Sequence, residues 1–214
     1  MAKVITTLDV ASAGRAILSV GTGWFELEHQ QLGFEFGTFT ERFNRLEEAL
    51  QILDPMIRGE RPTFSGDWYT AESAMAEPRC RDRVPILIGG SGEKKTFAIA
   101  ARSADHLNII AAFDELPRKM DAVAARCEEA GRDPATLETS LMLTAIVDEK
   151  LDPAHLPENV NRRTAAGSPA QIADQVQDKV LDAGVGGVIV NLPNGHTPGV
   201  ITAVAEALRP LVGV

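Results

Sequence analysis

The sequence alternates short apolar runs with longer segments of helical period. The apolar runs have the length of strands and lie at residues 16–20, 84–88, 106–110, 141–147 and 187–192. Because each run is almost continuously apolar, it is typical of a parallel strand that is covered on both faces. The alternation therefore predicts an α/β fold in which about five parallel strands are each followed by a helix.

The longest helical segment has a clear start and an apolar stripe. The stripe steps by four or three residues through Phe39, Phe43, Leu46, Leu50 and Leu53. Thr38 and Glu41 have the spacing of a capping box, which predicts that the helix begins there. Pro55 is expected to end it.

Similar stripes predict the other helices. One begins the chain at roughly residues 2–13, one runs from Leu116 to Cys127, and the last runs from Val200 to Leu211. Ser168 is expected to cap a helix that continues through Val180 and ends at Gly184.

The segment from Asp54 to Arg83 interrupts this rhythm. A small hairpin is expected in "RPTFSGDWYTAE", with Ser65-Gly66-Asp67 as its turn, and a loop of this length is typical of a lid or another functional segment. Because no low-complexity or Pro-rich linker divides the chain, residues 1–214 are expected to form a single domain.

Charge and composition narrow the classes of partner. A net charge of -9 argues against a nucleic-acid or anionic-membrane binder and favours a small-molecule substrate. The sequence contains no apolar stretch of membrane-spanning length, and Cys80 and Cys127 do not have metal-site spacing. We therefore expect a reduced, cytoplasmic protein without a metal site.

A glycine cluster follows the second apolar run, in "ILIGGSGEKK". Gly89, Gly90 and Gly92 would let backbone N–H groups converge on an anion beside the start of the next helix, and Lys94 and Lys95 add positive charge. A tight turn with solvated lysines explains the local pattern equally well. The cluster matches neither common nucleotide-binding motif.

A second glycine pair, Gly21 and Gly23, follows the first apolar run and precedes Trp24. Carboxyl ends of parallel strands lie at one edge of a sheet, so both glycine turns are expected there, which favours a ligand site. Trp24 is interpreted either as a core or lid residue or as a residue that stacks on a ligand ring.

Other candidate groups are weaker. Glu26, Glu28 and His29 could form an acid/base cluster, but a solvated loop is the favoured interpretation. The four histidines do not form a helical metal pair, and the sequence has no Gly-x-Ser-x-Gly or Cys/His nucleophile motif.

Several blocks resemble the luciferase-like monooxygenase superfamily and, more narrowly, its F420-dependent oxidoreductases. They are "TLDVASAGRAILSVGTGW", "ERFNRLEEALQIL", "PILIGGSGEKKTFAIAARSADHLNI", "GSPAQIADQV" and "GVIVNLP". The resemblance implies a (β/α)8 barrel that binds F420 or FMN at the carboxyl ends of its strands. It implies that Gly89, Gly90, Ser91 and Gly92 contact the phosphate-bearing tail and that Gly21, Thr22, Gly23 and Trp24 lie near the ring.

The resemblance begins at the helix before the family's fourth strand. The first three βα units would then be absent, so the expected fold is an incomplete, TIM-barrel-like (β/α)8 fold, and Met1 becomes a candidate internal methionine. About five strands cannot close an eight-stranded barrel. An open edge at residues 4–20 would favour self-association, so a homodimer is expected. No catalytic residue is assigned, because the family's catalytic positions often lie in the absent units.

The resemblance implies an F420-dependent oxidoreductase, or a truncated form of one, that transfers hydride to or from an unknown small organic substrate. Two alternatives remain. One is a non-catalytic flavin-binding or oligomeric short member of the family, and the other is an FMN-dependent monooxygenase.

Overall fold

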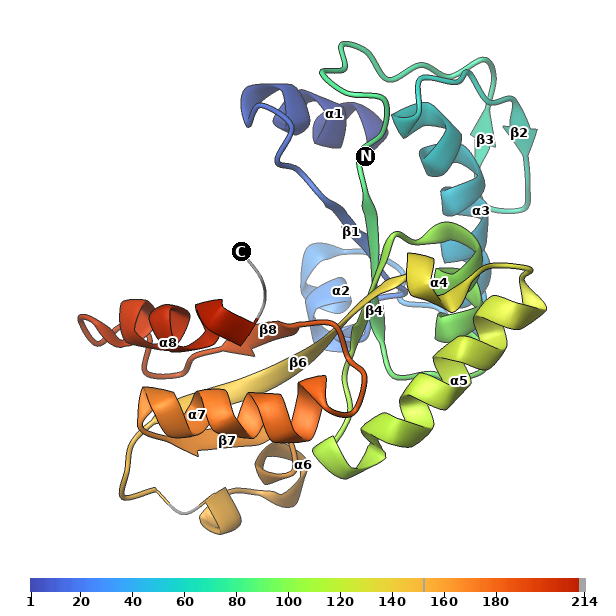
Figure 1. Ribbon diagram of the computed structural model, residues 1–214. Coiled ribbons are helices and arrows are strands. Elements are labelled where there is room, and N and C mark those ends of the chain that lie inside the picture. The colour runs from blue at the N-terminus through green and yellow to red at the C-terminus, as the bar shows by residue number, and fades with distance from the viewer. Residues whose placement is uncertain (152, 212–214) are drawn as a thin grey trace. The chain divides into compact units, whose positions relative to one another are not determined.

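The chain folds into two compact units in a computed structural model that describes residues 1–151 and 153–211 (Figure 1). Unit 1 comprises Met1–Gly89 and Arg102–His106. Unit 2 comprises Gly90–Ala101 and the chain from Leu107 onward. Buried apolar residues lie in both units.

All five predicted strands are present. They are β1 (Leu18–Val20), β4 (Ile86–Gly90), β5 (His106–Ile109), β6 (Glu138–Val147) and β8 (Val188–Asn191). A further strand, β7 (Thr164–Gly167), was not predicted, because "TAAG" is too short and too weakly apolar to stand out. The sheet order is β1-β4-β5-β6-β7, and β8 also pairs with β6. The predicted α/β fold with about five parallel strands is confirmed, and the sheet of the described residues has six strands.

Unit 1 pairs β1 with β4 in parallel, with Leu18 opposite Ile86 and Val20 opposite Ile88. Helix α1 (Ala2–Ala11) contacts α3 (Phe39–Ile57), and a short helix, α2 (Glu26–Leu32), lies between β1 and α3 in the sequence. The capping box of Thr38 and Glu41 is confirmed, since each side chain accepts a hydrogen bond from the other residue's backbone N–H.

Helix α3 continues through Pro55, so the prediction that this proline ends the helix was wrong. A proline inside a helix removes one backbone hydrogen bond. The next two residues, Met56 and Ile57, are buried in the core of unit 1. Their burial offsets the lost hydrogen bond and holds the last turn in helical conformation.

The hairpin expected in unit 1 consists of β2 (Phe64–Ser65) and β3 (Thr70–Ala71). Its turn lies one residue later than predicted, because Ser65 belongs to the strand and the Gly66 N–H donates to the Tyr69 carbonyl. The Glu48 carboxylate of α3 accepts hydrogen bonds from the N–H groups of Asp67, Trp68 and Tyr69 at 2.9, 2.9 and 3.1 Å. The hairpin is thereby fastened to α3.

In unit 2, β6 pairs with two strands in parallel. Thr144 to Val147 lie opposite β7, and Leu141 to Thr144 lie opposite β8. Unit 2 contains the helices α5 (Leu116–Glu129), α6 (Glu158–Asn161), α7 (Pro169–Val176) and α8 (Val200–Leu208). Helix α4 (Thr96–Ser103) begins in this unit and ends in unit 1.

Helix α7 begins as the sequence predicts and ends differently. Its capping box joins Ser168 and Gln171. The expected continuation through Val180 is a π-helical turn, η4 (Gln177–Leu181), and Gly184 follows with a positive φ of 88°. Within the described parts of the chain, no helix combines the length and apolar character needed to cross a membrane.

A buried carboxylate connects α1 to a distant loop of unit 1. Asp9 is 2% exposed, its Oδ1 lies 2.7 Å from Arg81 Nη2, and it also accepts hydrogen bonds from the Ala16 N–H and the Cys80 thiol. Burial alone would raise the pKa of Asp9, but these hydrogen bonds outweigh burial and hold the pKa below its ordinary value.

We predict that Asp9→Asn lowers the free energy of unfolding by about 3 kcal/mol at pH 7, because Arg81 loses its charge partner. The lowered pKa means that the wild-type contribution is present above the ordinary value of 3.8 and disappears as the pH falls through the folded-state pKa. Urea titrations at pH 7 and in acid should therefore show a difference that shrinks in acid. The exposed Asp121→Asn variant is the control, and an equal effect of both variants at pH 7 would contradict the prediction.

Candidate functional site

The glycine turn at the end of β4 has little room for side chains. Gly90 has a φ of 149°, and a Cβ atom there would lie 3.1 Å from Thr96 Cγ2. A Cβ atom at Gly92 would lie 2.9 Å from Thr96 Oγ1. Ser91, between them, is exposed. The turn therefore favours glycine on both sides of the exposed Ser91.

Helix α5 supports this turn from within unit 2. Lys119 is only 8% exposed, and its Nζ donates to the Ser91 carbonyl at 2.9 Å and lies 2.9 Å from Glu93 Oε1. Arg126 Nε donates to the Glu93 carbonyl at 3.1 Å, and Arg118 forms an ion pair with the Glu93 carboxylate. Three cations of one helix thus contact this turn. Two of them have further acidic partners, since Arg118 also pairs with Glu115 and Arg126 also pairs with Glu129.

Lys119 is a functional candidate that the sequence interpretation missed. It falls three residues after Leu116 and four before Val123, so it lies on the apolar stripe of α5. A lysine on such a stripe must reach a polar partner, which is a signal available in the sequence. Only the fold shows that the partner is the Ser91–Glu93 segment.

The second predicted turn lies in unit 1. The register of β1 and β4 brings Gly21 beside Gly89, since a Cβ atom at Gly21 would lie 4.0 Å from the Gly89 carbonyl oxygen. Gly23 has a φ of 73°, and a Cβ atom there would lie 3.2 Å from the His29 ring. As predicted, the two strand ends therefore lie side by side, at Gly21 and Gly89. Ser91 and Gly92 belong to unit 2.

Trp24 is 84% exposed and stacks on Phe25 with ring centroids 5.3 Å apart. The interpretation of Trp24 as a core residue was therefore wrong, because the side chain follows a turn and points away from the apolar interior. Its roles as a lid or as a ligand-stacking residue stay predictions.

Glu26, Glu28 and His29 lie in helix α2, so the expected loop was wrong, but both glutamates are exposed, as the expected solvation requires. His29 Nδ1 lies 2.9 Å from the Phe25 carbonyl oxygen, and its ring packs edge-on against Phe36 at 4.9 Å. These contacts give His29 a structural role, and the described residues contain no cluster of three or more His, Cys, Asp or Glu that could hold a metal.

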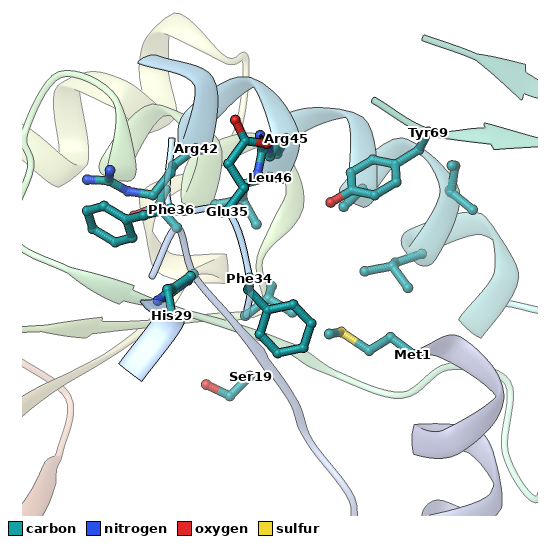
Figure 2. A pocket seen from close by; sticks show the side chains of 16 residues that line it. Met1, Ser19, His29, Phe34, Glu35, Phe36, Arg42, Arg45, Leu46 and Tyr69 are labelled. Atoms are coloured by element: carbon teal, nitrogen blue, oxygen red, sulfur yellow. Dashed lines mark hydrogen bonds and ion pairs between the residues drawn. The ribbon is translucent and has the colours of Figure 1, made fainter. Parts of the chain in front are cut away.

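A cavity of about 660 Å³ opens beside the second turn, and all its lining residues belong to unit 1 (Figure 2). This volume is typical of a site for a small organic molecule. Gly21 and Thr22 line it. The other lining residues are Met1, Ser19, Val20, His29, Phe34, Glu35, Phe36, Arg42, Arg45, Leu46, Ala49, Ile52, Leu53 and Tyr69.

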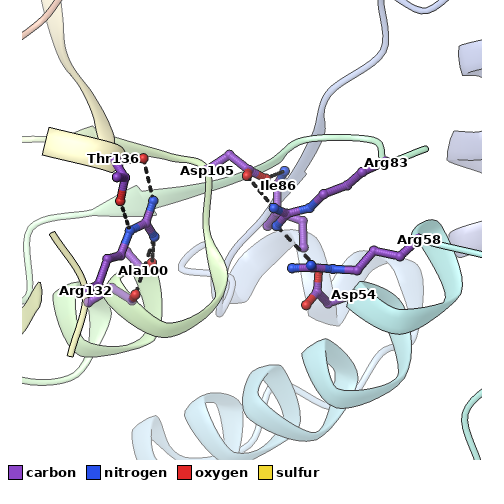
Figure 3. Close-up of polar contacts among 9 residues, drawn as sticks. Asp54, Arg58, Arg83, Ile86, Ala100, Asp105, Arg132 and Thr136 are labelled. Carbon is purple, nitrogen blue, oxygen red and sulfur yellow. Dashed lines mark hydrogen bonds and ion pairs between the residues drawn. The ribbon is translucent and has the colours of Figure 1, made fainter. Parts of the chain in front are cut away.

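Ion pairs fix the start of β4 in unit 1 (Figure 3). Asp105 accepts the Ile86 N–H at 2.8 Å and pairs with Arg83 at 2.7 Å. Arg83 also lies 3.4 Å from Asp54, which pairs with Arg58. The network anchors the strand four residues before the glycine turn.

A separate cluster in Figure 3 belongs to unit 2. Arg132 donates to the Thr136 side chain at 2.8 Å and to the carbonyl oxygens of Ala100 and Ala101 at 3.5 and 3.4 Å. These contacts satisfy two carbonyl groups near the end of α4. The helix that follows the glycine turn is thus held at its far end.

We predict that Lys119→Met loosens the glycine turn. Hydrogen bonding from Lys119, with further contributions from Arg118, holds the pKa of Glu93 below its ordinary value of 4.5. The Glu93 contribution to stability is present above that value and is lost as the pH falls through the folded-state pKa. NMR should show that Lys119→Met raises the pKa of Glu93 and speeds amide exchange at Gly90–Gly92. The exposed Lys94→Met variant should change neither quantity; a normal Glu93 pKa in the wild type would contradict the interpretation.

Comparison with known proteins gives the family. The family model described as luciferase-like monooxygenase matches residues 1–156. The chain is 41% identical over 105 residues to an F420-dependent glucose-6-phosphate dehydrogenase from Microbacterium testaceum. The matched region covers 49% of this chain and 31% of the relative. The chain is also 28% identical over 158 residues to the pyrimidine monooxygenase RutA from Cronobacter sakazakii. That matched region covers 70% of this chain and 45% of the relative.

The structure of an F420-dependent secondary alcohol dehydrogenase in complex with an F420-acetone adduct has the same fold. The TM-score is 0.83 at 20% identity, and the match covers 99% of this chain and 74% of the other. The expected partial TIM-barrel-like fold is confirmed. The chain spans less than half the length of the two curated relatives above. Since the family model matches well over half of the chain, the chain belongs to the luciferase-like monooxygenase family.

Proposed function

We propose that this chain acts in an F420-dependent oxidoreductase that transfers hydride to or from a small organic substrate. The similarity to an F420-dependent glucose-6-phosphate dehydrogenase supports this function. The observation that carries the proposal is the Gly90–Gly92 turn, where a Cβ atom at either glycine would crowd Thr96 and where the buried Lys119 donates to the Ser91 carbonyl.

The residues of the turn fit a phosphate-bearing cofactor. Gly89, Gly90, Ser91 and Gly92 would hold its tail, because the backbone is accessible there and the Ser91 hydroxyl is exposed. Gly21, Thr22, Gly23 and Trp24 would lie near its ring. When bound, a 5-deazaflavin supplies hydride transfer, and the task of these residues is to anchor and orient it.

A second candidate function is FMN-dependent monooxygenation, which the similarity to the pyrimidine monooxygenase RutA favours. F420 and FMN both carry phosphate, so the glycine turn suits either cofactor. A non-catalytic flavin-binding or oligomeric short member of the family is a third candidate. No catalytic residue is assigned under any of these.

Homodimerisation and a cytoplasmic location are parts of the same proposal. Val4, Leu8 and Ile17 of unit 1 are 72, 54 and 51% exposed, and covering them in a dimer would bury apolar surface. Cys80 and Cys127 are both free thiols, as expected in a reducing compartment.

We predict that Ser91→Glu weakens F420 binding at least tenfold, or about 1.4 kcal/mol, because the new carboxylate lies where the phosphate would bind. Ser91 is the better test position, since substitutions at Gly90 or Gly92 would strain the turn. Ser91→Ala is the matched control, with an expected loss of less than threefold. Cofactor fluorescence titrations measure both. Equal affinity for wild type and Ser91→Glu, in a folded variant, would remove this turn from the site.

A further inference from the structure

We propose that the cavity of unit 1 binds an organic anion through the guanidinium of Arg45, which Glu35 occupies when the ligand is absent. The proposal rests on the proposed function in one respect, since it names the class of substrate for that enzyme. The binding event itself requires no cofactor, so the two proposals can fail separately.

The floor of the cavity suits an apolar body. Leu46, Ala49, Ile52 and Leu53 of α3 line one side. Figure 2 shows the Phe34 ring pointing into the space between Met1 and the residues of α3. A ligand with an aromatic or branched aliphatic part would bury apolar surface here.

The charged lining residues favour an anion. Arg42 and Arg45 contribute two positive charges, and Glu35 contributes one negative charge. Arg42 lies 3.8 Å from the centroid of the Phe36 ring, and its Nη1 donates to the Gly37 carbonyl at 2.9 Å. Its charge is therefore fixed at the wall and adds to the positive potential of the cavity.

The contacts of Arg45 orient its guanidinium for binding a planar anion. Its side chain is 21% exposed, and its guanidinium lies 4.2 Å from the centroid of the Trp68 ring. The backbone N–H of Trp68 donates in turn to the carboxylate of Glu48, which lies one turn further along α3. The Nε atoms of Arg42 and Arg45 are buried, so a ligand in the cavity would meet the Nη groups of Arg45. A carboxylate or phosphate matches the spacing of such guanidinium donors.

Glu35 is a weak occupant of this guanidinium. Arg45 Nη2 lies 3.0 Å from Glu35 Oε2 and Arg45 Nη1 donates to the Glu35 backbone carbonyl at 3.3 Å, yet the Glu35 side chain is 77% exposed. Exposed ion pairs contribute little, because water competes for both partners. A ligand carboxylate that enters with an apolar body would meet Arg45 in drier surroundings and would displace Glu35.

Calorimetric binding of 2-naphthoate and of its uncharged amide, 2-naphthamide, tests the proposal. For wild type, 2-naphthoate should bind at least tenfold more tightly than the amide. Arg45→Gln should weaken 2-naphthoate binding at least tenfold, since an ionic hydrogen-bonded contact is lost. Glu35→Gln should tighten it about threefold, because the competing carboxylate is removed. Neither variant should alter binding of the amide by more than twofold.

Matched controls are Arg15→Gln and Glu28→Gln, which change charge at exposed positions outside the cavity lining. The opposite signs expected for Arg45→Gln and Glu35→Gln separate a binding role from loss of folding, because Glu35 lies on an exposed loop. Absence of 2-naphthoate binding, equal binding of acid and amide, or weaker binding in Glu35→Gln would each overturn the proposal. Binding that follows these predictions in a chain that does not bind F420 would refute the proposed function alone.

Discussion

The parallel pairing of β1 with β4 is the constraint on which the proposed site depends. Both strands of a parallel pair run in the same direction, so the register of Val20 with Ile88 places Gly21 next to Gly89. The ion pair of Asp105 with Arg83 and the hydrogen bond from the Ile86 N–H to Asp105 hold the start of β4 in place. A slip of one residue would reverse which side chains face the core.

Helix α3 organises the rest of unit 1. Its apolar residues pack in the core and line the cavity, while Arg45 and Glu48, spaced three residues apart, face the hairpin. The Glu48 carboxylate accepts hydrogen bonds from three backbone N–H groups. Desolvation alone would raise the pKa of Glu48, but these hydrogen bonds outweigh it and hold the pKa below the ordinary value. Helix α3 thus carries Arg45 and, through Glu48, also holds the hairpin whose Trp68 ring lies against the Arg45 guanidinium.

The local parts of this structure were predictable and the long-range polar contacts were not. The five apolar runs, the Thr38 capping box and the glycine turn follow from period and composition. The partners of Lys119 and Glu48 are 28 and about 20 residues away, and only the tertiary fold brings them together. The end of α3 was mispredicted because burial of Ile57 outweighs a local helix breaker.

Cofactor choice is the most direct test of the central claim that the turn belongs to an F420 site. In a fluorescence titration of the wild-type chain with F420, repeated with equimolar FMN present, we expect saturable F420 binding whose apparent affinity changes less than twofold. Displacement of F420 by FMN would favour the monooxygenase alternative. Absence of saturable F420 binding in the folded wild-type chain would contradict the claim.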